Sequence, residues 1–141
     1  MKAFNFLSIA LVSGTVIFAS CLKDDNNDNS GILPLIQHSW AVDSITLHNH
    51  TSAIDTTAVY YGQAADYFNF GTDGNLYTQL SGTKDTSSYF FLNTNTIVLI
   101  HGDGARDTGI ISTLTNNRLI GTSKKITNST DYTETTSYLK R

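Results

Sequence analysis

The sequence predicts an all-β domain, a small antiparallel up-and-down barrel of about eight strands, and two observations carry that prediction. Thr and Ser supply 30 of the 121 residues from Cys21 onward, whereas Glu occurs once, as Glu134. Thr and other β-branched or aromatic residues favour strands, whereas helices favour Ala, Leu, Glu and Lys. Turn residues also interrupt the apolar runs about every 8–12 positions, a spacing typical of sandwiches and barrels.

The individual strands are expected where β-branched and aromatic runs are bounded by Gly, Asn, Asp or Ser. The expected strands are 39–48, 66–70, 76–80, 85–92, 96–101, 107–115, 118–127 and a last one ending near Lys140. A polar stretch, 49–57, precedes 58–61, which is either a short strand or a loop. Residues 32–37 allow one helical turn, limited by Pro34. Connections after Tyr67 are short, so neighbouring strands should pair, and closing the meander into a barrel removes its edges.

The first 20 residues have the parts of a cleaved secretory signal peptide. Lys2 is the one charge before an uncharged, mostly apolar stretch that ends in Ala19 and Ser20. Phe18-Ala19-Ser20-Cys21 resembles the bacterial lipobox, although Phe18 stands where an aliphatic residue is more usual. The resemblance implies cleavage before Cys21 and its lipidation, with palmitate among the acyl chains, and several chains anchor a protein stably. The alternative is that Cys21, the sole cysteine, is a signal-peptide residue or a free thiol.

Residues 21–31 are charged and rich in amides, and they predict a flexible tether because they offer little apolar surface to bury. Lys23, Asp24 and Asp25 follow the cysteine directly. This arrangement resembles the export signal of Bacteroidetes-type surface lipoproteins. It implies an outer-membrane protein that is lipid-anchored and exposed on the cell surface. The alternative is a plain solvated linker.

The remaining segment, 32–141, resembles the lipocalin-like domains of Bacteroidetes lipoproteins from about Ile36 onward. The motifs, in order, are Trp40, Phe68-Asn69-Phe70-Gly71-Thr72-Asp73-Gly74, Tyr89-Phe90-Phe91, Asn116-Asn117-Arg118-Leu119 and Tyr138-Leu139-Lys140-Arg141. The chain departs from lipocalins at His38, where they have Gly two residues before the Trp. The resemblance implies a lipocalin-like barrel with Trp40 plugging its floor. It also implies that Arg141 or Arg118 stacks over that ring, a cation–π pair worth about 0.5–2 kcal/mol.

The histidine pair His48-x-His50 has a spacing that places both rings on one strand face, as a zinc site requires. A third ligand would have to come from His38, His101 or an Asp, and the sequence places none nearby. We therefore expect polar loop histidines and no metal site.

Other candidate groups also have ordinary explanations. Asp103, Arg106 and Asp107 fit a turn with Gly102 and Gly104 better than a ligand-reading loop. Glu134 either points into the barrel as an acid or ligand anchor or, as we expect, faces solvent from mid-strand.

Two triplets, Asp43-Ser44-Ile45 and Asp55-Thr56-Thr57, resemble the O-glycan acceptor pattern of Bacteroidetes. Thr56 is expected in the polar loop, which makes it a better acceptor than Ser44.

Catalytic motifs are missing from the sequence: it has no Gly-rich phosphate loop, no Ser elbow and a single Glu. We expect no enzyme and no cofactor. The formal net charge of −3 argues against a nucleic-acid partner, which needs a clustered basic face.

The sequence therefore favours a surface-anchored binding protein whose barrel accepts a small apolar or amphipathic ligand. A domain of this length is short for a roomy barrel, so its interior could instead be filled by side chains. The alternative function is a structural or interaction module of a cell-surface complex, which would use the outside of the sheet. The expected partners are the membrane, through the lipid anchor, and either a small hydrophobic ligand or a surface protein.

Overall fold

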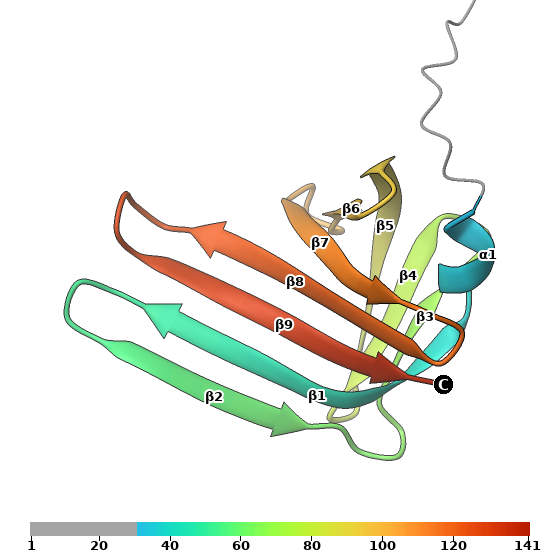
Figure 1. Ribbon diagram of the computed structural model, residues 1–141, viewed down its shortest axis with the longest axis horizontal. Helices are drawn as coiled ribbons and strands as arrows, with labels where there is room; N and C mark the ends of the chain where they lie inside the picture. The colour runs from blue at the N-terminus through green and yellow to red at the C-terminus, as the bar shows by residue number, and fades with distance from the viewer. Residues whose placement is uncertain (1–30) are drawn as a thin grey trace, which may run out of the picture.

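The computed structural model describes residues 31–141, which form one short helix and a continuous antiparallel sheet (Figure 1). Its elements are α1 (Leu33–Ile36), β1 (Ser39–His50), β2 (Asp55–Tyr61), β3 (Tyr67–Phe70), β4 (Asn75–Leu80), β5 (Thr83–Asn93), β6 (Thr96–Ile100), β7 (Arg106–Leu114), β8 (Arg118–Ile126) and β9 (Tyr132–Lys140). The predicted signal peptide, Cys21, and the export residues Lys23, Asp24 and Asp25 lie outside the described residues.

The strand order confirms the predicted fold class. From β3 to β9 each strand pairs with the next in sequence, and β1 pairs with both β3 and β9. Eight strands, β1 and β3 to β9, thus close an up-and-down barrel, and β2 is an extra strand on β1. On the side of β1 away from β9, residues 39–41 pair with β3, whereas residues 44–50 pair with β2.

The predicted strand boundaries hold within about two residues, except around the first hairpin. β1 runs on to His50, and β2 begins at Asp55, inside the stretch 49–57 for which the sequence predicts a polar loop. The register pairs His50 with Asp55 and Asn49 with Thr56. Backbone pairing can hold such exposed, polar residues in a hairpin without burying them, so the hydrophobic pattern does not reveal this part of the strands.

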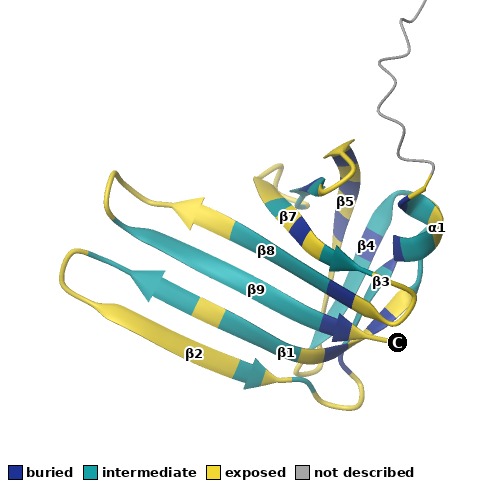
Figure 2. Ribbon diagram, in the orientation of Figure 1, coloured by how far each residue is buried: buried dark blue, intermediate teal, exposed yellow. Residues whose placement is uncertain are grey.

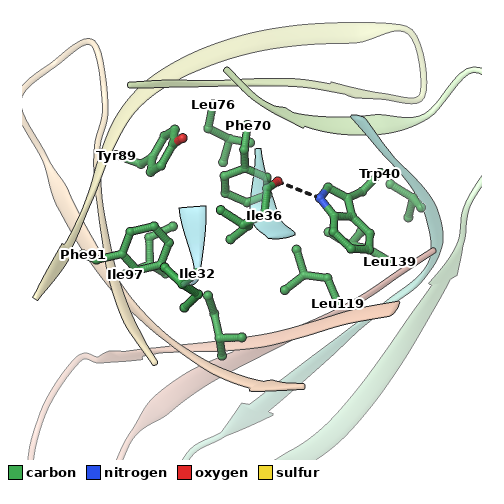
Figure 3. Packing of buried hydrophobic residues seen from close by; sticks show 12 residues of the cluster. Ile32, Ile36, Trp40, Phe70, Leu76, Tyr89, Phe91, Ile97, Leu119 and Leu139 are labelled. Atoms are coloured by element: carbon green, nitrogen blue, oxygen red, sulfur yellow. Dashed lines mark hydrogen bonds between the residues drawn. The ribbon is translucent and has the colours of Figure 1, made fainter. Parts of the chain in front are cut away.

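The core fills one end of the barrel, where α1 is inserted between the strands (Figure 3). Ile36 and Trp40 are completely buried, and the Trp40 indole N–H donates to the carbonyl of Ile36 at 2.9 Å. The guanidinium carbon of Arg141 lies 5.5 Å from the Trp40 ring, so Arg141 takes the position that the resemblance left open between two arginines. The helical turn and the indole together close this end.

A bulge in β1 and the connection 62–66 mark the place where β2 ends and β3 begins. The register of β1 against β9 shifts between Val42 and Ser44, and the Gly62 N–H donates to the carbonyl of Asp43 at 3.0 Å. A Cβ on Gly62 would lie 2.0 Å from the carbonyl oxygen of Val42. Glycine is therefore required there by a close approach of two backbones.

At the other end of the barrel, β1, β2, β8 and β9 run on past the remaining strands, and Figure 1 shows them projecting as an open sheet. We call this part the extended sheet; it comprises residues 44–50, 55–61, 123–126 and 132–137, which pair with one another. Its residues are mostly exposed or half-buried, in contrast to the buried positions around α1 (Figure 2). Within residues 31–141, no helix has the length and apolar character to cross a membrane.

Candidate functional site

Successive side chains of a strand point to opposite faces of a sheet, so the buried side chain of Leu139 identifies which face of the extended sheet continues the barrel interior. Residues that alternate with Leu139 on β9, and their register partners, continue the barrel interior, and we call this the inner face. It carries Ile45, Leu47, Asn49, Thr56, Ala58, Tyr60, Ser123, Lys125, Thr133, Thr135 and Ser137. The outer face carries the intervening residues, including His48, His50, Lys124, Ile126, Tyr132 and Glu134.

A hollow of about 100 Å³ lies inside the barrel, between the buried core and the inner face. Its core side is apolar, with Ile36, Phe70 and Leu119, whereas its other side carries the hydroxyls of Ser123 and Ser137. Pockets that hold a drug-sized molecule have about 300–1,000 Å³. Side chains therefore fill most of the barrel, and the remaining space suits only one end of a small molecule.

A second, more open hollow of about 400 Å³ adjoins β2 on the inner face. Its lining includes Ile45, Leu47 and Leu80. Ile45 pairs with Ser137, and Leu47 pairs with Thr135. The second hollow therefore lies one strand away from two hydroxyls that line the barrel hollow. The inner face thus offers an apolar strip on β1 and β2 beside a row of hydroxyls on β9.

The rim of this second hollow is fixed by Asp66, a buried carboxylate that is 2% exposed. The Tyr60 hydroxyl donates to it, and so do the backbone N–H groups of Gln63 at 2.8 Å and Ser81 at 2.9 Å. These donors, the Tyr60 hydroxyl first, hold the pKa of Asp66 below its ordinary value. Asp66 thereby connects the end of β2 to the β4–β5 turn through Tyr60 and Ser81, which both line the hollow.

Chemically, the inner face can hold a molecule with an apolar part and a few polar groups. The apolar strip provides non-directional burial, and the hydroxyls can each donate or accept a hydrogen bond. Neutral hydroxyls dominate the row, and Lys125 alone of the inner-face residues carries a charge. This composition favours an uncharged or weakly anionic amphipathic ligand.

On the outer face, the structure supplies the third side chain that the sequence did not place beside His48 and His50. The β1–β2 register brings Asp55 opposite His50, and each of its carboxylate oxygens contacts one imidazole. Both histidines lie in β1, so the expectation of loop histidines is wrong. Spacing along the chain identifies the histidine pair, but the partner across the hairpin depends on a register that spacing alone does not give.

Three hydrogen-bonded side chains, those of Ser87, His101 and Asp107, have the residue types of a catalytic triad. The Ser87 hydroxyl lies 3.0 Å from Nδ1 of His101, and Nε2 of His101 lies 2.9 Å from Asp107. Ser87 is 6% exposed, however, which shields its oxygen from a substrate. We assign the three residues to holding β5 against the β6–β7 turn, and the absence of enzymatic activity stays a prediction.

The remaining candidates take the places that the sequence favours, with one exception. Asp103 accepts a hydrogen bond from the N–H of Ala105 at 2.9 Å in a turn where Gly104 has a φ of 84°. Glu134 lies mid-strand on the outer face, opposite His48. The exception is Thr56, which lies within β2 and not in a loop. Ser44 lies within β1, next to the bulge.

Comparisons with known proteins add little to these observations. No protein-family model and no curated protein matches the chain. Among solved structures, a deswapped triple mutant of bovine odorant-binding protein is similar, with 15% identity over 75% of this chain and 73% of that chain, at a TM-score of 0.48. The assignment of the fold rests on the strand pairings of this chain, and the resemblance to Bacteroidetes lipoproteins stays a prediction.

Proposed function

We propose that the protein binds a small amphipathic molecule on the inner face of the extended sheet, with the apolar end of the ligand in the barrel hollow. The observation that carries the proposal is that the two hollows are lined by neighbouring strands, because Ile45 and Leu47 of one lining pair with Ser137 and Thr135 of the other. Buried Ile36 and Trp40 close the end at α1, so the proposed ligand enters from the side of the extended sheet.

The small barrel hollow decides what kind of ligand fits. A space of about 100 Å³ does not enclose a whole lipid chain. The ligand must therefore lie mostly on the sheet, where Leu47 and Ala58 provide apolar surface and the β9 hydroxyls provide polar contacts. Such a half-open site suits a compact amphiphile better than a long-chain fatty acid.

A fluorescence titration with the neutral amphiphile N-phenyl-1-naphthylamine tests the proposal on a chain of residues 31–141, which contains all the described strands. Burying one leucine side chain is worth about 1.5–3 kcal/mol. Leu47→Glu should therefore weaken binding by at least about 10-fold.

The matched control for Leu47→Glu is Ile126→Glu, which introduces the same charge at a position on the outer face that is 70% exposed. It should bind the probe like the wild-type chain. No binding by the wild-type chain, or equal losses in both variants, would overturn the proposal. Cooperative unfolding of both variants shows that each is folded.

A second candidate function, a module of a surface complex, is favoured by the outer edge of β2. In the described residues β2 ends the strand order, and β1 is its one partner. Such an edge can receive a strand from another protein. If the wild-type chain binds no amphiphile from a lipid extract in native mass spectrometry, this candidate replaces the first.

For its location, we propose an outer-membrane lipoprotein anchored through Cys21, with Lys23, Asp24 and Asp25 directing it to the cell surface. The motifs of the sequence support this proposal. Cys21→Ala should abolish incorporation of labelled palmitate, and a variant that still incorporates the label and still sediments with membranes would refute the anchor. Alanine at 23–25 should keep lipidation and remove protease accessibility on whole cells, and unchanged accessibility would make these residues a plain linker.

A further inference from the structure

The outer face of the extended sheet carries a compact group of three side chains with metal-ligating atoms. One ligand atom from each of His48, His50 and Asp55 lies within 4.8 Å of the others. Nε2 of His48 is 2.5 Å from Oδ1 of Asp55, and Nδ1 of His50 is 3.2 Å from Oδ2. The group lies beside the β1–β2 turn, on the face opposite the proposed ligand site.

The strands themselves place these three groups together. Positions 48 and 50 of β1 are two residues apart and so project from the same face. Asp55 is the first residue of β2 and the register partner of His50. Two ligands therefore come from one strand and the third from its hairpin partner, across a turn of four residues, 51–54, so that a short and well-paired segment defines the site.

Aromatic packing restrains both imidazoles. Tyr132 of β9 stacks on His50, with ring centroids 5.0 Å apart and planes 25° apart, and it meets His48 edge-on at 5.8 Å. The ammonium of Lys124 lies 3.5 Å above the Tyr132 ring centre. Lys124 thus makes a cation–π contact with Tyr132. Because the two imidazole rings are already restrained, less conformational entropy is lost when they bind a metal ion.

The surrounding charges include carboxylates as well as Lys124. Hydrogen bonds with Asn128 and then Thr130 hold the pKa of Asp131 below its ordinary value, and Asp131 lies near His50. Glu134 of β9 is the register partner of both His48 and Lys124. The contacts with His48 and then His50 hold the pKa of Asp55 below its ordinary value, so its carboxylate is ionised at neutral pH.

The geometry points to a binding site for a divalent transition metal, with zinc as the best match, formed by Nε2 of His48, Nδ1 of His50 and the carboxylate of Asp55. Zinc–nitrogen and zinc–oxygen bonds are about 2.0–2.2 Å, which puts tetrahedral ligands about 3.4 Å apart. Nδ1 of His50 and Oδ2 of Asp55 are already near that separation, whereas Nε2 of His48 and Oδ1 of Asp55 have to move apart by about 1 Å. The carboxylate then gives one of its two oxygens to the metal. Water takes the fourth position.

Metal binding requires a definite change at each imidazole. In the hydrogen-bonded state, the ring nitrogens that face Asp55 carry the protons donated to the carboxylate. Zinc takes the lone pair of those nitrogens, so the proton of a neutral ring must lie on Nδ1 of His48 and on Nε2 of His50. The pair therefore coordinates through unlike nitrogens, which distinguishes this site from two histidines that both bind through Nε2.

The test is a zinc titration of the full chain in detergent at pH 7.5, followed by isothermal calorimetry and competition with a chelating indicator. The wild-type chain should bind one zinc ion per chain. His48→Gln, His50→Gln and Asp55→Asn should each weaken binding by at least about 10-fold, because even loss of a residue that only supports a ligand costs about 10–100-fold. NMR of ¹⁵N-labelled histidine should show zinc-induced shifts at Nε2 of His48 and Nδ1 of His50.

The matched control is His101→Gln, because His101 and Asp107 form another exposed histidine–aspartate pair, at 2.9 Å, without a second histidine. This variant should bind zinc like the wild-type chain. Absence of one-to-one binding by the wild-type chain overturns the inference, as does an equal loss in His101→Gln. Wild-type affinity in all three ligand variants also overturns it. Amphiphile binding by Asp55→Asn tests the proposed function separately, because that site lies on the other face.

Discussion

Trp40 connects the helical turn, the first strand and the chain end at the scale of a single residue. Its indole N–H satisfies the carbonyl of Ile36, and its ring faces the Arg141 guanidinium. The sequence resemblance placed this tryptophan correctly, because a large aromatic early in the first strand has few other places to be buried. The sequence alone does not decide whether Arg141 or Arg118 stacks on Trp40, because the answer depends on how the last strand is placed against the first.

Trp40→Ala should lower the free energy of unfolding by about 3–5 kcal/mol, the usual range for removing a large buried aromatic side chain. Denaturant unfolding followed by circular dichroism measures the change. Tyr61→Ala, at a position that is 75% exposed, is the control and should change stability by less than about 0.5 kcal/mol. Similar losses in the two variants would contradict the role of Trp40 as the plug of the barrel.

Asp66 should make the free energy of unfolding depend on pH in the acid range. Because the pKa of Asp66 is lower in the folded chain than in the unfolded chain, its stabilising effect is complete above the ordinary value of 3.8. It is lost as the pH falls through the lower, folded pKa. Asp66→Asn should be less stable than the wild-type chain at pH 7 and should lose less stability between pH 5 and pH 2, as measured by melting temperature.

Tyr60→Phe provides an independent check of this pH dependence, because the Tyr60 hydroxyl is the largest cause of the Asp66 shift. It should raise the pKa of Asp66 towards its ordinary value and reduce the acid-induced loss in part. An acid-induced loss in Asp66→Asn equal to that of the wild-type chain would show that other carboxylates control this behaviour.

At the scale of elements, β2 depends on a backbone contact more than on its own burial. Most of its residues are exposed, and Gly62 at its end approaches the Val42 carbonyl closely. Gly62→Ala should destabilise the chain by about 1–3 kcal/mol, the usual cost of forcing atoms into a packed site. Amide hydrogen exchange should also become faster in β2 than in β9.

The control for Gly62→Ala is Gly102→Ala, because a Cβ at Gly102 meets no atom within 4 Å. Its unfolding free energy should stay within about 0.5 kcal/mol of the wild-type value. If Gly62→Ala has an equally small effect, the close approach of the two backbones does not control the position of β2.

The first hairpin also shows which parts of the fold could be predicted from the sequence. The sequence predicts strands with buried positions closely, such as 76–80 and 96–101, because their apolar residues face the core. Asp55, Thr56 and Thr57 carry no such signal, and their strand exists through pairing with β1. The same register brings Asp55 to the histidines, so the cluster was missed for the same physical reason.

At the scale of the whole molecule, the chain combines a filled barrel with an extended sheet that has two unlike faces (Figures 1 and 2). The predicted barrel and its closure follow from short connections and regular strand spacing. The extended sheet could not be predicted, because it depends on how far β1, β8 and β9 continue past their neighbours. Its inner face carries the proposed amphiphile site, and its outer face carries the proposed metal site.

Methyl NMR during titration with N-phenyl-1-naphthylamine tests the proposed ligand site most directly, because it reports on both faces of the sheet at once. We predict the largest shifts at the methyl groups of Ile45, Leu47 and Leu80, and unchanged signals at Ile126 on the outer face. Shifts centred on Ile126, or no shifts at saturating probe, would contradict the proposal that the inner face binds the ligand.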